Sequence, residues 1–410
     1  MASVGRSRPR PGTCRAASQP PVSNPRPKDV DVRNHARRGR LLLLAVLAFA
    51  LAACGEAPQN VLDPQGPFAQ KPDDLFRYVI LIALAVFVVV QALIIYAVVK
   101  YRDKGDDSPL PAQVHGNTRM ELVWTIVPAL ILAGIAVPTI QTVFDLAETP
   151  EGAMEIEVIG HRWWWEYRYP GMGADGQDII TANEMVIPVD TPIHLRMTAE
   201  ESGSADNAVI HSYWVPALAG KQDVAPGRIT TLNMQADTTG VFQGQCTEYC
   251  GLSHAYMRNY ATVVTQAEFE QWLQEQSQPA PEPAEGSLEA RGKELFRQGF
   301  EVEGYDSPQA CISCHAINND GAAVGPNLTH LMSREMFAGA IFDLYLRDES
   351  TVWGNWTDEP DTEALKSWVM NAPEMKAMRP TAETGRVGMP NLGLSEDEAE
   401  AIVAYLLTLE

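Results

Sequence analysis

Cysteine is scarce in this chain, with six residues among 410. So few thiols do not make a disulfide framework, which is typical of small, cysteine-rich secreted chains. Four of the six form two short patterns instead, one pair four positions apart and the other three positions apart. A fifth ends an apolar segment, and only Cys14 lies outside any pattern. We interpret the paired thiols as groups that hold redox metals.

Basic residues are also scarce beyond the beginning of the chain. The sequence has 31 Lys and Arg against 52 Asp and Glu. Residues 1–53 hold ten of the basic residues and two of the acidic ones, so the remainder carries a net charge of −29. This charge excludes nucleic acid as a partner and would steer a basic protein to the surface, more weakly as salt rises. A merely solvated acidic surface is the alternative.

Residues 1–53 are predicted to be a signal peptide. The basic stretch RNHARRGR precedes the apolar stretch LLLLAVLAFALAAC, which is too short to span a bilayer, since spanning needs about 20 apolar residues. LAAC followed by Gly55 resembles a bacterial lipobox, which would make Cys54 a lipidated residue. Ordinary cleavage after Ala50–Ala52 is the alternative. The long Pro- and Arg-rich stretch before the apolar core indicates an over-extended start site.

Two longer apolar segments within residues 70–146 are predicted to span the membrane. Tyr78–Val99 contains no charged residue, and the basic cluster of residues 100–104 after it should stay in the cytoplasm. Leu122–Phe144 returns across the membrane, and its two prolines are tolerated in membrane helices. We therefore expect the chain after Asp145 to lie outside the cytoplasm.

The rest of the chain divides into two predicted domains. Residues 150–275 contain short β-rich runs separated by turn signals, which predicts an all-β sandwich or barrel. Residues 276–287 are rich in Pro and Glu and are expected to form a stiff, extended linker. Residues 288–410 are predicted to be mostly helical, and Ser395 and Glu398 have the spacing of a capping box before the last helix.

The first cysteine pair lies in the segment CTEYCGLSHAYM. Cys246 and Cys250 are followed by His254 and Met257, and His211 lies 35 residues before the first cysteine. Thiolate, imidazole and thioether ligands together suit copper in electron-transfer sites, and two cysteines suggest two metals that share bridging sulfurs. A structural Cys₂His₂ zinc site is the alternative, but it leaves Met257 without a role.

The second cysteine pair lies in CISCH, the covalent haem-attachment pattern C-x-x-C-H. Cys311 and Cys314 would form thioether bonds to a c-type haem, and His315 would be an iron ligand. We expect Met389 to be the second iron ligand, because Met/His ligation raises the reduction potential as an electron relay requires.

The segments HSYWVPALAGKQDVAPGR and CTEYCGLSHAYM together resemble subunit II of cytochrome c oxidase, and the similarity runs from the membrane hairpin to about residue 272. The resemblance implies a cupredoxin-like domain with a binuclear mixed-valence copper (CuA) centre. Cys246 and Cys250 would bridge both coppers. The resemblance further implies terminal and weak ligands from His211, His254, Met257 and the carbonyl oxygen of Glu248. The side chain of Glu248 would reach a magnesium ion at the interface with the catalytic subunit.

Two further segments match this family. HRWWWEYRY places Trp163 where electrons from a cytochrome c enter, with aromatic core packing as the alternative. ELVWTIVPA places Glu121 at the cytoplasmic mouth of a proton path, with an ordinary interfacial carboxylate as the alternative. Ala208 stands where the family often has an acidic residue, a departure that concerns docking rather than the copper ligands.

The C-terminal segment is similar to small cytochromes c. GPNL (residues 325–328) resembles the loop under the haem histidine, and VGMPNLG places a methionine just before the last helix. Met375 and Met378 are the alternatives to Met389. Gly292 and Tyr405 are expected to allow two helices to cross closely.

The predicted fold is a two-helix transmembrane hairpin, an all-β cupredoxin-like sandwich and a C-terminal all-α cytochrome c domain. This combination resembles subunit II of bacterial caa-type oxidases. The resemblance implies a multi-pass protein of the bacterial inner membrane, with copper and haem on the periplasmic side. It would pass electrons from cytochrome c or another donor through haem c and copper to the oxygen-reducing subunit I, with subunit III as a further partner. A CuA-bearing subunit of a nitric-oxide-reducing complex and a membrane-anchored copper chaperone are the alternatives.

Overall fold

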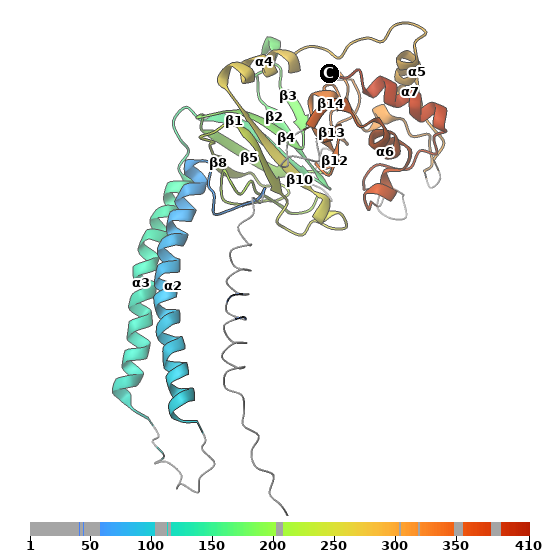
Figure 1. Ribbon diagram of the computed structural model, residues 1–410. Helices are drawn as coiled ribbons and strands as arrows, with labels where there is room; N and C mark the ends of the chain where they lie inside the picture. Colours follow the sequence, from blue (N-terminus) through green and yellow to red (C-terminus); the bar gives the residue numbers. More distant parts are fainter. Residues whose placement is uncertain are drawn as a thin grey trace, which may run out of the picture. The chain divides into compact units, whose positions relative to one another are not determined.

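The computed structural model describes residues 41, 44, 58–102, 113, 116–201, 208–302, 305–318, 320–347, 356–378 and 387–410. Cys54 and nearly all of the predicted signal peptide lie outside the described residues. Residues 57–410 form one compact unit, and its elements are shown in Figure 1.

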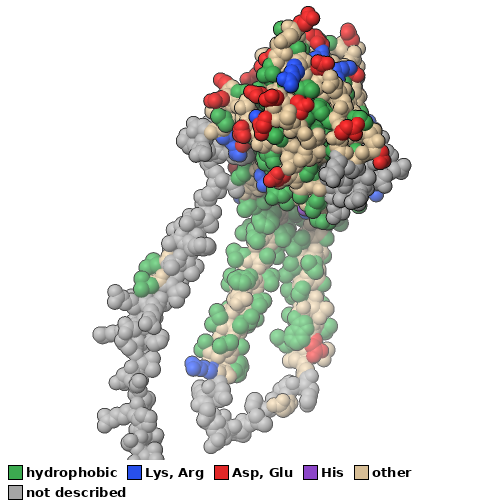
Figure 2. Space-filling model, turned by 90° about the vertical axis from the view of Figure 1, so that its right-hand side faces the viewer, with side chains coloured by type: hydrophobic (Ala, Val, Ile, Leu, Met, Phe, Trp, Pro, Cys, Tyr) green, Lys and Arg blue, Asp and Glu red, His purple; other side chains and the backbone are tan. Residues whose placement is uncertain are grey.

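Two long helices run side by side (Figure 1). Helix α2 spans Pro67–Lys100 and helix α3 spans Thr118–Ala147, and both are long and apolar enough to cross a membrane. Apolar side chains cover these helices, whereas many acidic side chains dot the domain surface beside them (Figure 2). Both helices extend beyond the predicted apolar cores. At the start of α3 the Asn117 side chain accepts hydrogen bonds from two main-chain N–H groups, which sets its first turn.

The helix hairpin is fixed to the β domain at its outer end. The Asn233 side chain donates hydrogen bonds of 3.0 Å to the carbonyl oxygens of Leu146 and Glu148, at the end of α3. These carbonyls have no partner within the helix, so a side chain from a strand supplies one. Phe68, in the first turn of α2, is buried in the β-domain core.

The β domain is a sandwich of a five-stranded and a three-stranded sheet. The five-stranded sheet has the order β3-β2-β1-β5-β8 and the other has the order β4-β10-β9, while β6 pairs with β7 separately. The strands are β1 (Met154–His161), β2 (Trp164–Tyr169), β3 (Ile179–Ala182), β4 (Glu184–Pro188), β5 (Ile193–Ala199), β6 (His211–Tyr213), β7 (Gln222–Val224), β8 (Thr230–Met234), β9 (Gly240–Gln245) and β10 (Arg258–Val264). Helix α4 (Gln266–Gln276) follows them and begins with a capping box from Thr265 and Glu268. This arrangement confirms the predicted cupredoxin-like class.

The C-terminal region is built around two crossing helices. Its helices are α5 (Leu288–Arg297), α6 (Thr362–Met375) and α7 (Glu396–Leu406). A Cβ atom added at Gly292 would lie 1.9 Å from the carbonyl oxygen of Ala401, so only glycine allows α5 and α7 to approach this closely. The capping box of Ser395 and Glu398 is present at the start of α7.

Two short pairs of strands add to the helices of this region. β11 (Met336–Phe337) pairs with β12 (Phe342–Asp343), and β13 (Tyr345–Arg347) pairs with β14 (Trp356–Pro360). The segment between β11 and β12 has three consecutive residues with positive φ, Ala338, Gly339 and Ala340. Neither pair was predicted, because runs of two to five residues carry too little periodicity to be recognised.

Candidate copper and haem sites

The predicted copper ligands come from one loop and one short strand. His211 begins β6, Cys246 follows β9 directly, and Met257 directly precedes β10. β9 and β10 are antiparallel partners with Gln245 opposite Arg258. Because pairing continues to the last residue of β9, the twelve residues between β9 and β10 must form a loop whose two ends lie together.

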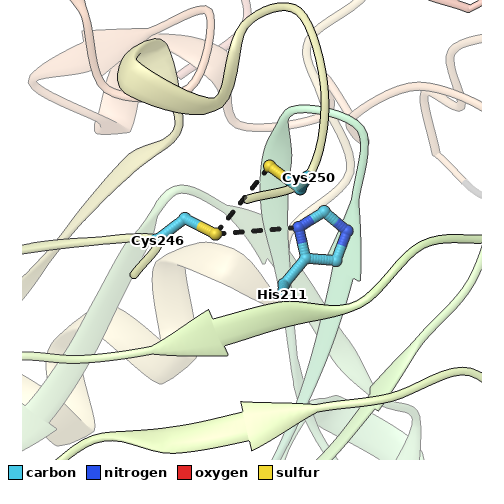
Figure 3. Close-up of side chains that lie close together, drawn as sticks. All are labelled: His211, Cys246 and Cys250. Carbon is cyan, nitrogen blue, oxygen red and sulfur yellow. Dashed lines mark hydrogen bonds between the residues drawn. The ribbon is translucent and has the colours of Figure 1, made fainter. Parts of the chain in front are cut away.

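The buried donor atoms of His211, Cys246 and Cys250 all lie within 4.8 Å of one another (Figure 3). The Cys246 Sγ is 3.8 Å from His211 Nδ1 and 3.9 Å from Cys250 Sγ. A disulfide needs an S–S distance near 2.05 Å, so both thiols are free. The two sulfurs and the imidazole therefore converge on one point, as a metal cluster requires.

Three further predicted ligands surround this group. Cys250 Sγ lies 3.6 Å from His254 Nδ1 and 3.8 Å from Met257 Sδ. Cys246 Sγ lies 3.2 Å from the carbonyl oxygen of Glu248. The structure thus brings together all six positions that the sequence suggested.

The two thiols affect each other's protonation. The hydrogen bond between Cys246 and Cys250 lowers the pKa of Cys246 and raises the pKa of Cys250. The contact therefore favours the thiolate form of Cys246 over that of Cys250. Metal binding needs thiolates and would displace the remaining proton.

Close packing fixes the position of His211, one of the two histidines at this site. The Trp165 ring lies edge-on to His211 with ring centroids 5.7 Å apart. A Cβ atom added at Gly160 would lie 2.9 Å from the His211 ring, so a side chain there would push the imidazole away. Sequence reasoning did not single out Gly160, because nothing in its local pattern shows that β1 passes under a ligand on β6.

A second site is a cavity of about 550 Å³ beside the haem-attachment motif. Its wall includes Cys311, Cys314, His315 and Met389. The size and the mostly apolar lining suit a large organic cofactor. The structure therefore gathers the four predicted haem-binding residues around one space.

His315 has its ring orientation fixed. Its Nδ1 donates a 2.8 Å hydrogen bond to the carbonyl oxygen of Pro326, which leaves Nε2 without a proton for an iron ligand bond. Burial lowers the pKa of His315, which favours the neutral ring. A Cβ atom added at Gly325 would lie 2.7 Å from this ring, which explains the glycine of GPNL.

Two of the three candidate methionines reach the cavity. Met378 and Met389 both line it, whereas Met375 lies in the last turn of α6 and is absent from the lining. The main-chain N–H of Met389 donates a 3.2 Å hydrogen bond to the sulfur of Met378. Met378 thus contacts the loop that carries Met389.

Trp163 lies between the two sites. Its indole Nε1 donates a 3.0 Å hydrogen bond to the carbonyl oxygen of Cys250, and its side chain also lines the haem cavity. Trp163 is only 5% exposed, and Trp164 and Trp165 are buried as well. Trp163 is therefore packed in the interior and also contacts both sites, while its role in electron entry stays a prediction.

Two buried cations near the cavity were missed by the sequence analysis. Arg334 and Lys376 both line the cavity and are nearly fully buried. Burial lowers the pKa of Arg334 to about 10 and that of Lys376 to about 7. Basic residues are usually exposed, so neither burial could be read from the local sequence.

Glu121 lies exposed in the first turn of α3. Its Oε1 accepts a 3.2 Å hydrogen bond from the main-chain N–H of Asn117. This contact gives the Asn117 N–H a partner at the start of α3, so the carboxylate has a structural role there.

The fold and the two sites define a membrane-anchored protein with a copper cluster and a haem pocket outside the bilayer. Models of the cytochrome c oxidase subunit II transmembrane and periplasmic domains match residues 56–142 and 154–264, and a cytochrome c model matches residues 289–410. Cytochrome c oxidase subunit 2 of Alkalihalophilus pseudofirmus is 34% identical, covering 90% of this chain and 97% of its own length. The chain therefore belongs to the cytochrome c oxidase subunit 2 family, with a C-terminal cytochrome c domain.

Two other relatives show the range of the similarity. Cytochrome c oxidase subunit 2 of Bacillus subtilis is 28% identical, covering 90% of this chain and 97% of its own length. Quinol oxidase subunit 2 of Bacillus spizizenii is 35% identical but covers only 59% of this chain and 74% of its own.

Proposed function

We propose that this chain relays electrons, one at a time, from an external donor through haem c and a CuA centre to the oxygen-reducing subunit of a caa-type oxidase. The observation that carries the proposal is the position of Trp163, which lines the haem cavity and is hydrogen-bonded to Cys250. When bound, a c-type haem and a two-copper centre each accept and release one electron.

The residues present fit a copper pair. Two thiolates, two imidazoles, a thioether and a carbonyl oxygen form a donor set that suits copper. Cys246 and Cys250 would hold the pair together with His211 on β6 and His254 on the loop, whose Nδ1 atoms face the sulfurs. Met257 is fully buried and would keep water from the centre. The copper-chaperone alternative predicts exposed ligands, whereas His211, both cysteines and Met257 are buried.

The residues present also fit a haem. Cys311 and Cys314 would hold it covalently, and His315 and Met389, which also line the cavity, would bind the iron. Arg334 adds independent support, because its buried Nε has no hydrogen-bond partner among the described residues. A haem carries carboxylates, and a buried guanidinium is stabilised by an anionic partner.

The surface beside the copper loop supports a partner subunit. Tyr249 is 75% exposed, and Leu252 and Tyr256 are each about half exposed. The Glu248 side chain is exposed next to them and would be free to bind magnesium together with groups of subunit I. We propose this face as the contact with the catalytic subunit, with Glu121 at the cytoplasmic end of α3 beside a proton path. Subunit III would complete the assembly.

Partial reduction of the purified chain tests the relay. The chain loaded with haem and copper would receive less than one electron equivalent per molecule, followed by haem absorption and copper EPR. We expect both centres to share the electrons within the mixing time. A copper centre that stays oxidised while the haem is reduced would contradict the proposal.

A further inference from the structure

The haem domain contacts the copper domain through specific hydrogen bonds. The main-chain N–H groups of Glu335 and Met336 donate to the hydroxyl of Tyr260 on β10, at 3.2 and 3.1 Å. The main-chain N–H of Arg258 donates a 2.9 Å bond to the carbonyl oxygen of Gly339. Bonds of this kind fix one relative position of two surfaces. A domain that merely diffuses at the end of a linker would not need them.

Lys376 makes the most unusual of these contacts. It caps the C-terminal end of α6, and its Nζ donates to the carbonyl oxygen of Trp163 at 2.8 Å and to that of Ala338 at 2.7 Å. Both acceptors are main-chain groups, so the amine bridges the β1–β2 connection and the β11–β12 turn. A buried lysine is costly unless its donors are satisfied, which gives the position a function beyond filling space.

Trp163 is thereby held through both its side chain and its main chain. Its side chain donates to Cys250 on the copper loop, and its carbonyl oxygen accepts from Lys376 of the haem domain. The residue is nearly fully buried. A soluble protein could touch its indole only after the haem domain had moved.

The turn that receives Lys376 is shaped for this contact. Ala338 and Ala340 both have φ of 55°, a left-handed conformation that L-residues rarely adopt. Such backbone persists only where surrounding contacts stabilise it, and it is common at functional sites. A Cβ atom added at Gly339 would lie 2.5 Å from Lys376 Nζ and 2.6 Å from the Trp163 carbonyl oxygen. The turn therefore admits no side chain at its centre.

We propose that Lys376 is a positioning residue that locks the haem domain onto Trp163, so that a soluble donor protein reaches the copper centre only through haem c. The lock closes the surface around Trp163 and leaves the haem domain as the docking site of the donor. The step it controls makes and breaks no bond: one electron leaves iron(II) haem, giving iron(III), and the oxidised copper pair gains that electron. This part of the inference rests on the proposed function, whereas the lock itself does not.

Hydrogen–deuterium exchange of the full-length, cofactor-loaded chain tests the lock without any turnover. In Lys376→Met and Gly339→Ala, peptides covering residues 163–165 and 338–340 should exchange about tenfold faster, as expected when a buried hydrogen bond is lost. Lys376→Arg should restore much of the protection. Lys366→Met is the matched control, since Lys366 lies on the same helix and pairs with the exposed Glu396. Wild-type protection in Lys376→Met would overturn the proposal.

Stopped-flow mixing with a reduced soluble cytochrome c tests the route. In the wild type and in Lys366→Met, haem c should be reduced before copper. In Lys376→Met, part of the copper should be reduced directly, at a rate that rises with donor concentration, and Lys376→Arg should reverse this change. Direct copper reduction in the wild type would overturn the closed route. A chain without a copper signal would instead contradict the proposed function. The hydrogen–deuterium exchange measurement would still test whether Lys376 fixes the haem domain in place.

Discussion

Single residues decide whether the two sites hold their cofactors. The haem iron has two sulfur candidates on the cavity wall, and the geometry separates them. The sulfur of Met378 accepts the N–H of Met389, so Met378 supports the loop while the Met389 side chain remains available to the iron.

Replacing these methionines one at a time should therefore give different results. Met389→His should lower the haem reduction potential by on the order of 0.1 V, because thioether ligation raises it within the roughly 0.8 V range that axial ligands cover. Met378→Leu should leave both ligands in place and change the potential much less. Potentiometric titration of the haem band measures both. The reverse ranking would assign the iron ligand to Met378.

A buried carboxylate at the domain contact should make stability depend on pH. Burial raises the pKa of Glu184 from its ordinary value of 4.5 to about 7, against a hydrogen bond from Thr262. The folded state thus binds a proton more tightly than the unfolded state. The stabilisation that this proton gives is full below about pH 4.5 and is lost as the pH rises to about 7. The free energy of unfolding changes by up to about 3 kcal/mol over this range.

Glu184→Gln should remove this dependence. The thermal unfolding midpoint of the wild type should fall between pH 5 and pH 8, and that of Glu184→Gln should change much less. Glu285→Gln, at an exposed position, serves as the control and should behave as the wild type does. An equal fall in all three proteins would show that Glu184 is not the group responsible.

At the scale of helices and strands, the sequence predicted those elements whose structure depends only on residues close together in the chain. The charge-free run before Lys100 predicted a spanning helix, and the ligands within residues 246–257 predicted a metal-binding loop. Strand β6, three residues long, was not predicted, because its pairing with β7 depends on tertiary contacts. Likewise, no pattern in APEMKAM shows that Lys376 is buried, since its acceptors lie far away in sequence.

The crossing of α5 and α7 depends on one glycine. In Gly292→Ala the new Cβ would meet the Ala401 carbonyl oxygen and lie 2.8 Å from Tyr405 Cβ. Overpacking of this kind costs about 1–3 kcal/mol, so the haem domain should unfold several degrees earlier when followed by haem absorption. Gly134→Ala in α3 is the matched control, because no atom lies within 4 Å of the added carbon. Equal midpoints in both variants would refute the close crossing.

For the whole molecule, we expect the acidic surface to attract a basic donor on the side of the membrane that carries the two domains. The chain beyond residue 53 carries a net charge of −29, and acidic side chains dominate the charged groups in Figure 2. Reduction of haem c by a basic soluble donor should slow several-fold as ionic strength rises from about 20 to 200 mM, since such attraction is screened. A salt-independent rate, measured by stopped flow, would indicate a merely solvated surface.

The central claim is that this chain holds a two-copper centre and a covalent haem together. The most direct measurement is the EPR and optical spectrum of the detergent-purified full-length chain after haem maturation and copper loading, with Cys250→Ser beside it. We predict a delocalised two-copper EPR signal and a reducible c-type haem band in the wild type. In Cys250→Ser only the copper signal should be lost. A wild-type chain that shows the haem band but holds zinc, or copper without the two-copper signal, would contradict the account.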